Sequence, residues 1–149
     1  MTTDPAPSQP KVFIIILTWN RLSDTLECLE SVKKIVYPNY EIIVVDNGST
    51  DGSAEAIARR YPEITLVKNE SNLGYAAGNN RGMETALHMG CDYVFLLNND
   101  TTIDAVCLDE LVNRAESDPR VGAAGPKIYL HQDPSTVWYA GGEICKPFQ

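Results

Sequence analysis

The chain has 149 residues, 44% of them hydrophobic, which is enough to build one compact domain with a sizeable core. It carries 12 lysines and arginines against 20 aspartates and glutamates, so its formal net charge is −8. Because such a surface repels a polyanion, the charge argues against nucleic acid as a partner. A phosphorylated ligand would have to be neutralised locally, and a divalent cation held by carboxylates is the usual means.

The cysteines and the apolar runs indicate a reducing, cytoplasmic location. The four cysteines form no CxxC pair and have no histidine at metal-ligand spacing, so we expect reduced thiols at Cys28, Cys91, Cys107 and Cys145. No apolar run is long enough to cross a bilayer, and residues 1–10 (MTTDPAPSQP) are polar and proline-rich, unlike a signal peptide. We therefore expect a flexible tail over residues 1–10 and a cytoplasmic protein without a transmembrane segment, peripheral at the inner face of the membrane if it contacts one.

The first elements form a strand–helix–strand unit. The unbroken apolar runs over residues 12–17 and 42–45 are typical of parallel strands covered on both faces. Between them, apolar residues recur at helical spacing over residues 22–32, and Asp24 with Glu27 is expected to form a capping box near the helix start.

The alternation of strands and helices continues along the chain. We expect helices over residues 52–60 and 75–89, strands over residues 64–67 and 93–97, and a last helix that contains residues 106–115. Gly90 is expected to close the long helix, and Asp104 to cap the last one. From residue 122 onward, short extended pieces at 127–130 and 136–139 are separated by a turn at 131–135. The pattern predicts a doubly wound, mostly parallel α/β sheet flanked by helices.

Three loops that follow predicted strands are unusually polar: residues 18–21, 46–51 and 98–100. Right-handed crossovers place such loops along one edge of the sheet, where ligands bind in open α/β folds. Taken singly, each loop also suits a simple turn that caps the next helix, and Asp51 is expected to be such a cap. Neither GxGxxG nor GxxxxGK[ST] is present, so a diphosphate at this edge would need a metal.

Four segments, VFIIILTWNR, EIIVVDNGSTDGS, NESNLGYAAGNNRG and YVFLLNND, resemble in order and spacing the successive motifs of family 2 glycosyltransferases, which have the GT-A fold. The resemblance covers nearly the whole chain from Lys11 onward, and the segment GPKIYLHQDPSTVWYAGGEI resembles the rhamnosyltransferase subgroup. It implies a GT-A nucleotide-sugar-binding domain over residues 11–149. It also implies transfer of a sugar, with inversion, from a UDP- or dTDP-linked donor to a saccharide or lipid-linked acceptor in cell-surface polysaccharide or glycoconjugate synthesis.

The resemblance also assigns roles around the nucleobase. The loop after the first strand would cradle the base, with Trp19 offering its aromatic face and Thr18 and Asn20 supplying polar contacts; the alternative for Trp19 is a place in the core. Either Asp46 or Asn47 would read the base edge, because a carboxylate can accept the ring N–H of uracil or thymine. Many family members have two aspartates here, so the choice between the two positions stays open.

The triplet Asn98, Asn99 and Asp100 occupies the place of the family's DxD motif, which implies that Asp100 coordinates Mg²⁺ or Mn²⁺ bridging the donor's two phosphates. Asn98 and Asn99 would be neutral ligands or sugar contacts; the alternative is a turn at the strand end. Gly74, Gly78 and Asn79 would lie beside the donor.

The small residues of that helix start also suit tight helix-to-sheet packing at Ala76, Ala77 and Gly78. Arg81 is expected to be solvated or ion-paired, and His88 and His131 to be structural or exposed.

No segment after Val121 resembles the family's acidic motif for the catalytic base. We therefore expect the base beyond residue 149, and the chain to be the donor-binding part of a longer enzyme whose acceptor half is missing here. Two alternatives remain at this point. A sugar nucleotidyltransferase would carry a GxGTR-like loop where residues 18–21 stand, and a non-catalytic nucleotide-sugar-binding module would lack the base altogether.

Overall fold

The computed structural model describes residues 9–143, which divide into two compact units between Ala105 and Val106. Most of the expected tail lies outside the described residues, but its last two residues are anchored to the first unit. The Asn39 side-chain amide donates to the Gln9 carbonyl oxygen (2.6 Å), and the Tyr37 hydroxyl donates to that of Pro10 (2.6 Å). Among residues 9–143, no helix has the length and apolarity needed to span a membrane.

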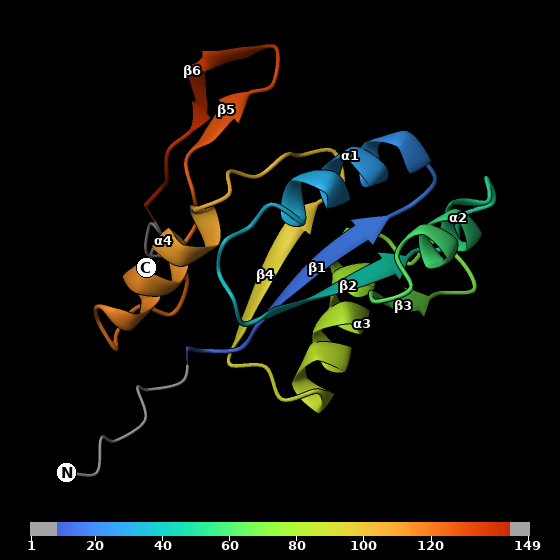
Figure 1. The fold of residues 1–149 in the computed structure, drawn as a ribbon, viewed down its shortest axis with the longest axis horizontal. Coiled ribbons are helices and arrows are strands. Elements are labelled where there is room, and N and C mark those ends of the chain that lie inside the picture. Colours follow the sequence, from blue (N-terminus) through green and yellow to red (C-terminus); the bar gives the residue numbers. More distant parts are fainter. Residues whose placement is uncertain (1–8, 144–149) are drawn as a thin grey trace, which may run out of the picture. The chain divides into compact units, whose positions relative to one another are not determined.

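A four-stranded parallel sheet forms the centre of the first unit (Figure 1). Its strands are β1 (Val12–Thr18), β2 (Tyr40–Asp46), β3 (Thr65–Lys68) and β4 (Tyr93–Asn98), in the order β3-β2-β1-β4. The apolar runs behave as predicted: β1 is buried along nearly its whole length, because it pairs with β2 on one side and β4 on the other. The predicted doubly wound, mostly parallel α/β sheet is confirmed.

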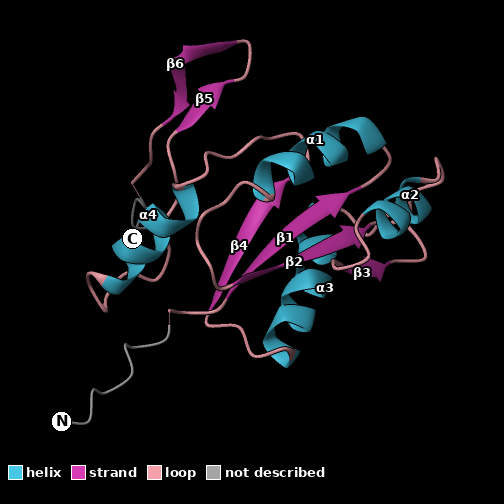
Figure 2. Ribbon diagram, in the orientation of Figure 1, coloured by secondary structure: helices cyan, strands magenta, loops and turns pink. Residues whose placement is uncertain are grey.

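The connecting helices cover both faces of this sheet (Figure 2). They are α1 (Leu22–Val32), α2 (Ser53–Arg60) and α3 (Tyr75–His88). The chain proceeds from β1 outward to β3 through α1 and α2, and then returns across β1 through α3 to reach β4. Right-handed crossovers in opposite directions put α3 on the face opposite α1 and α2. The strand order therefore reverses between β1 and β4, and ligands bind at such a switch point.

Alternate residues of each strand face opposite helices. Toward α3, a fully buried cluster contains Phe13, Ile15, Ile43, Val45 and Ala86. Toward α1, the Thr18 hydroxyl meets that of Thr25 at 2.8 Å. The core thus has two layers, one on each face of the sheet.

Two glycines let α3 lie close to the sheet. A Cβ on Gly78 would fall 2.6 Å from Leu17 Cδ1, and one on Gly82 would fall 2.5 Å from Ile15 Cγ2 and 2.9 Å from Val45 Cγ2. Both contacts are far shorter than van der Waals separation, so either the neighbouring side chains or the helix would have to shift to accommodate a Cβ. The two glycines thus allow α3 to pack closely on β1 and β2.

The second unit contains α4 (Cys107–Glu116) and an antiparallel pair, β5 (Ile128–Leu130) and β6 (Asp133–Tyr139). The two extended pieces are confirmed, but β6 begins at Asp133, inside the stretch predicted as a turn. The pair is irregular, with register shifts on both sides of Tyr129.

One predicted helix cap is wrong, and another helix begins further along the chain than its predicted cap. Helix α1 has Arg21 as its N-cap, with no side-chain cap hydrogen bond, and Asp24 instead accepts from the guanidinium of Arg21 (3.1 Å). Helix α4 has Val106 as its N-cap, also without a side-chain cap, so the helix starts after the position expected for an Asp104 cap. Asp51 does cap a helix start, as predicted, although Gly52 is the N-cap residue of α2. The Asp51 carboxylate accepts from the backbone N–H of Ser53, the first residue of α2 (3.0 Å).

Replacing Gly82 by alanine is expected to destabilise the fold by up to about 2 kcal/mol. Overpacking of a full core costs about 1–3 kcal/mol, and the better helix propensity of alanine recovers about 1 kcal/mol of it. Urea unfolding measures the change. Gly122→Ala is the matched control, because a Cβ there meets nothing within 4 Å. Equal urea midpoints for Gly82→Ala and wild type would contradict the predicted overpacking and show that the packing around Gly82 accepts a Cβ without cost.

Candidate functional site

The register of the sheet brings the ends of its strands to one level. Thr18 pairs with Asp46, Leu17 with Asn98, and Asp46 with Lys68. The loops that follow these strands therefore start side by side. The predicted convergence of the polar loops at this edge is confirmed by the hydrogen bonds between them.

The loop after β1 is tied to the loop after β2. The backbone N–H of Asn47 donates to the Thr18 carbonyl oxygen (2.8 Å), and that of Asn20 donates to Ser49 Oγ (2.8 Å). The backbone N–H of Thr50 donates in return to Asn20 Oδ1 (3.0 Å). Asn20 thus links the two loops through its backbone and its side chain.

Asn47 fastens the loop after β2 to the segment that leads into α3. Its Nδ2 donates to Asn72 Oδ1 (2.8 Å) and to the Gly74 carbonyl oxygen (3.3 Å), and its Oδ1 accepts from Asn69 Nδ2 (3.0 Å) and the Leu73 N–H (3.1 Å). These four bonds use both amide hydrogens and both lone pairs of the oxygen. The side chain is also 2% exposed. Asn47 therefore acts as a loop clamp, and of the two candidates for reading a base edge the geometry favours Asp46.

Asp46 is almost buried, with 4% of its surface exposed. One carboxylate oxygen, Oδ1, accepts from the backbone N–H of Ser49 (3.2 Å). The other oxygen has no hydrogen bond to residues 9–143, and no fully buried side-chain oxygen or nitrogen among those residues lacks a partner. The second oxygen is therefore the accessible part of this side chain and is available to a ligand.

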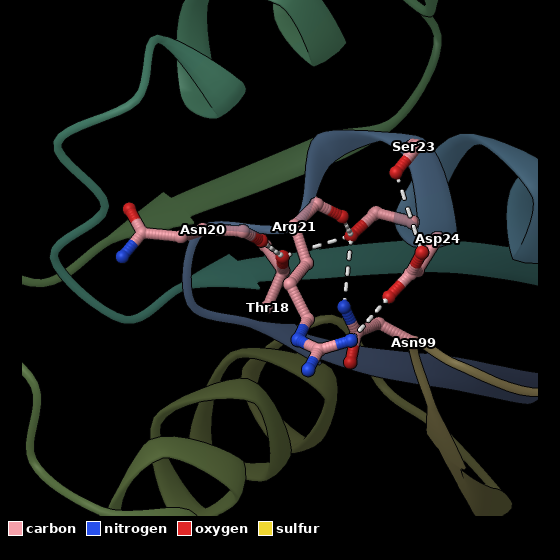
Figure 3. A network of polar contacts seen from close by, with 7 residues as sticks. Thr18, Asn20, Arg21, Ser23, Asp24 and Asn99 are labelled. Atoms are coloured by element: carbon pink, nitrogen blue, oxygen red, sulfur yellow. Dashed lines mark hydrogen bonds and ion pairs between the residues drawn. The ribbon is translucent and has the colours of Figure 1, made fainter.

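A chain of hydrogen bonds connects the loop after β4 to β1 through α1. Asn99 Nδ2 donates to Thr25 Oγ1 (3.0 Å), which lies 2.8 Å from Thr18 Oγ1. Figure 3 shows Thr18 and Asn99 approaching one point from the two sides. These hydrogen bonds continue to backbone carbonyl oxygens of the loop after β1. Thr18 Oγ1 donates to that of Asn20 (3.0 Å), and Thr25 Oγ1 donates to that of Arg21 (3.3 Å).

Asn98 and Asp100 complete the loop after β4. The Tyr75 hydroxyl, from the first turn of α3, donates to Asn98 Oδ1 (3.1 Å), and the Cys28 thiol donates to the Asn98 carbonyl oxygen (3.6 Å). Burial raises the pKa of the Cys28 thiol to about 12, with a further contribution from the negative charge of Asp100. The Asp100 carboxylate itself is exposed and forms no hydrogen bond or ion pair with residues 9–143.

Trp19 lies in the loop after β1 with 54% of its surface exposed, so the alternative of a core position is wrong. An exposed indole can stack on a planar ligand. Together with the second oxygen of Asp46 and the carboxylate of Asp100, it is one of three groups at this edge that the loop network leaves free.

The predicted residues at the start of α3 behave differently from one another. Gly74 has φ 79°, a conformation that favours glycine, and its position on the surface leaves it open to a ligand. Gly78 packs against Leu17 and Asn47, and Asn79 is 4% exposed, with its amide donating to the Tyr75 carbonyl oxygen (3.0 Å). Tight packing on the sheet therefore holds for Gly78, but not for Ala76 and Ala77, which are both exposed.

Three further predictions concern residues outside the site. Arg81 is exposed and pairs with Glu84 (3.1 Å), as expected. His88 and His131 are exposed, and His88 Nδ1 contacts the Glu84 carbonyl oxygen at 2.7 Å. Among the described residues, Cys28, Cys91 and Cys107 form no disulfide, whereas Cys145 lies outside them.

Comparison with known proteins gives the family. The sequence model of "Glycosyl transferase family 2" matches residues 13–146. The chain belongs to glycosyl transferase family 2. Membership decides against the sugar nucleotidyltransferase alternative.

Family 2 relatives with assigned names are longer than this chain. An N-acetylglucosaminyl-diphospho-decaprenol L-rhamnosyltransferase of Mycobacterium tuberculosis is 35% identical over 95 residues, covering 58% of this chain and 31% of the relative. A poly-beta-1,6-N-acetyl-D-glucosamine synthase of Staphylococcus epidermidis is 29% identical over 121 residues, covering 78% of this chain and 29% of the relative. The chain thus spans about a third of the length of these family 2 relatives.

Among solved structures, the family 2 chain is similar to the mannosyltransferase PcManGT from Pyrobaculum calidifontis in complex with GDP-Man and Mn²⁺. The TM-score is 0.73 at 27% sequence identity, and the match covers 87% of this chain and 38% of that one. This likeness confirms the GT-A fold predicted from the sequence motifs.

The donor set at the loop after β4 of this family 2 chain fits a divalent cation that is shared with a ligand. Among residues 9–143, no group of three or more His, Cys, Asp or Glu residues is arranged to hold a metal ion. Mg²⁺ often takes only one or two protein carboxylates and fills its octahedron with phosphate oxygens and water. A single exposed carboxylate, Asp100, beside the amides of Asn98 and Asn99 meets that requirement once a diphosphate is present.

Sequence reasoning on this family 2 chain missed several residues that shape the site. Thr25 is fully buried at an inward position of α1, and Gly82 repeats the close approach of Gly78 one turn later. The signals were available: a threonine in the apolar stripe of an amphipathic helix, and glycines four residues apart on one helix face. Tyr75 and Ser49 carried no such signal, because their roles depend on how separate loops meet.

Asn47→Asp is expected to lower the free energy of unfolding by about 1–3 kcal/mol. The change keeps the shape of the side chain but replaces the donor to Asn72 and Gly74 with an acceptor, which leaves buried oxygens facing one another. Chemical denaturation measures the loss. Asn80→Asp makes the same chemical change at an exposed position of α3 and should leave stability within about 0.5 kcal/mol. Similar losses in both variants would contradict the clamp role.

Proposed function

We propose that this chain binds a nucleoside diphosphate sugar at the switch point between β1 and β4 and serves a glycosyltransferase that inverts the anomeric centre of the transferred sugar. The observation that carries the proposal is the set of free groups at one sheet edge. An exposed indole (Trp19), an accessible oxygen of a buried carboxylate (Asp46) and an unpaired carboxylate (Asp100) lie on loops that are otherwise tied together. Family membership and the transferase names of the relatives support it.

The base end of the donor would be held by the loops after β1 and β2. Trp19 would stack on the base, while Thr18 and Asn20 shape the loop that carries it. Asp46 would accept the ring N–H of a uracil or thymine, which favours a UDP- or dTDP-linked sugar. Asn47 would hold the pocket wall without touching the base.

The diphosphate end would lie between the loop after β4 and the start of α3. Asp100 would hold Mg²⁺ or Mn²⁺ there, with Asn98 and Asn99 beside it, and the bound cation supplies stabilisation of the negative charge on the departing diphosphate. Gly74 exposes the first N–H groups of α3, and a helix N-terminus favours anions. A net charge of −8 gives an anionic ligand no overall electrostatic attraction to the protein.

The acceptor would be a saccharide or lipid-linked hydroxyl compound, and a lipid-linked acceptor would bring the enzyme to the cytoplasmic face of a membrane. The Mycobacterium tuberculosis relative is named for an acceptor of the lipid-linked kind. Inversion in one displacement needs a carboxylate base to take the hydroxyl proton. We propose that this base corresponds to a residue in the part of the longer relatives that residues 1–149 do not match.

The binding part of the proposal is tested by calorimetric titration with UDP, dTDP, GDP and ADP, each with and without Mn²⁺. We expect UDP or dTDP to bind best, and only with the metal present. Asp100→Ala should weaken binding in Mn²⁺ at least about 10-fold, because it removes the one carboxylate of the metal site. Asp109→Ala, the same change on α4, is the control. Equal UDP affinity in wild type and Asp100→Ala, with EDTA having no effect, would refute the metal role.

The role of Asp46 is tested by Asp46→Asn, which preserves the shape but weakens the acceptor. We expect UDP affinity in Mn²⁺ to fall about 10–100-fold, the equivalent of one charge-assisted hydrogen bond of about 1.5–3 kcal/mol. A thermal melt separates this loss from unfolding. An unchanged dissociation constant for UDP, or ADP binding as tight as UDP in the wild type, would exclude Asp46 as the base reader.

A further inference from the structure

Helix α1 carries a row of polar side chains on its buried face. Thr25, Cys28 and Ser31 recur every three residues, and their exposed fractions are 0%, 0% and 8%. Apolar residues normally occupy such a face, since burying a polar group costs free energy unless it is hydrogen-bonded. These three side chains are all bonded, and each has a partner within residues 98–103.

The partners follow one another along the loop after β4. Thr25 Oγ1 accepts from the side chain of Asn99 (3.0 Å), and the Cys28 thiol donates to the Asn98 carbonyl oxygen (3.6 Å). Ser31 Oγ accepts from the backbone N–H of Ile103 (3.1 Å) and donates to the Cys28 carbonyl oxygen (2.7 Å). Successive turns of α1 thus fasten the loop on both sides of Asp100.

Asp100 itself contributes nothing to this anchoring. Its carboxylate makes no hydrogen bond or ion pair with residues 9–143, so its position depends on the backbone between Asn99 and Thr101. Within the loop, Thr101 bonds back to the Asn98 carbonyl oxygen through its N–H (3.3 Å) and its hydroxyl (2.6 Å). The turn is therefore closed on itself, and α1 is the element that holds it.

We propose that Thr25, Cys28 and Ser31 are positioning residues that hold the Asn98–Asp100 turn in its metal-binding geometry, and that Thr25 couples this turn to the loop carrying Trp19. The inference rests on the proposed function. It adds residues that touch neither the donor nor the cation. Thr25 is the central member, because among the described residues it is the only one of the three whose side chain also hydrogen-bonds to β1, through Thr18 (2.8 Å).

The hydroxyl hydrogens of Thr18 and Thr25 can be arranged in two ways, and both connect the Asn98–Asp100 turn to the loop that carries Trp19. In one, Asn99 donates to Thr25, Thr25 to Thr18, and Thr18 to the Asn20 carbonyl. In the other, Thr18 and Asn99 both donate to Thr25, which donates to the Arg21 carbonyl. In both arrangements, hydrogen bonds connect the Asn98–Asp100 turn to a backbone carbonyl of the loop that presents Trp19. Hydrogen bonds in such a chain polarise and strengthen one another.

The test compares Thr25→Val with Thr25→Ser. Valine keeps the volume and removes the hydroxyl, whereas serine keeps the hydroxyl. UDP affinity is measured by calorimetry at a series of MnCl₂ concentrations, which gives the Mn²⁺ concentration for half-maximal effect, and again in EDTA. We expect Thr25→Val to raise that Mn²⁺ concentration about 10-fold, the usual cost of losing a partner that orients a metal-binding group, and Thr25→Ser to restore it.

The matched control is Thr85→Val on α3, where the threonine hydroxyl, within residues 9–143, bonds only to its own helix, at the Arg81 carbonyl oxygen (3.0 Å). Ser31→Ala tests the other end of the turn should Thr25→Val fail to fold, and it should raise the Mn²⁺ requirement in the same direction. A Thr25→Val midpoint within twofold of wild type, or an equal shift in Thr85→Val, would overturn the positioning role while leaving the proposed function in place. Absence of Mn²⁺-dependent UDP binding in the wild type would instead overturn the proposed function, and this inference with it.

Discussion

The register of the central parallel sheet is the constraint on which the rest of this structure depends. β1 is buried on both faces and paired on both edges, so a slip by one residue would reverse which side chains face α1 and which face α3. That pairing sets Thr18 beside Asp46 and Leu17 beside Asn98. The level of the strand ends, and hence the meeting of four separate loops, is fixed by hydrophobic burial far below the site.

Above the sheet, two buried side chains convert this proximity into a defined geometry. Asn47 joins the loop after β2 to the segment before α3, and Thr25 joins the loop after β4 to β1. Both are fully bonded, and a buried polar network is stabilising only when its members are satisfied. The groups left over, Trp19, one oxygen of Asp46 and Asp100, are thus held in place by neighbours rather than by their own contacts. Such preorganisation lowers the cost of binding a charged ligand.

The sequence was sufficient for the fold because its strongest patterns report burial. The apolar run over residues 12–17 and the helical spacing over residues 22–32 each describe one element and its covered face, and both were confirmed. The predicted cap of α1 was wrong because a cap depends on the local backbone path, and Asn20, the neighbour of Arg21, is held by the loop after β2. Periodicity carries no information about such contacts.

The same distinction applies to the candidate site. Strand-end polar residues identified the correct edge, because strand ends are predictable from burial. The sequence alone could not assign different roles to Asp46 and Asn47, since both are polar and they are adjacent at the end of β2. Only the partners of Asn47, at residues 69–74, distinguish a clamp from a ligand contact.

The turn at the end of β1 contains backbone strain, which costs free energy of folding. Asn20 and Arg21 both have φ near +57° (57° and 56°), although neither is glycine. A left-handed residue with a side chain costs roughly 1–2 kcal/mol, less for asparagine than for arginine. The Asn20 bonds to Ser49 and Thr50 offset part of this, at about 1 kcal/mol each, and the Arg21–Asp24 pair adds little because it is exposed. A relaxed turn would let the chain enter α1 directly and would release Asn20 from the loop after β2. The strain is therefore the consequence of holding the Trp19 loop and the Asp46 loop together, which is the geometry that the proposed donor site requires.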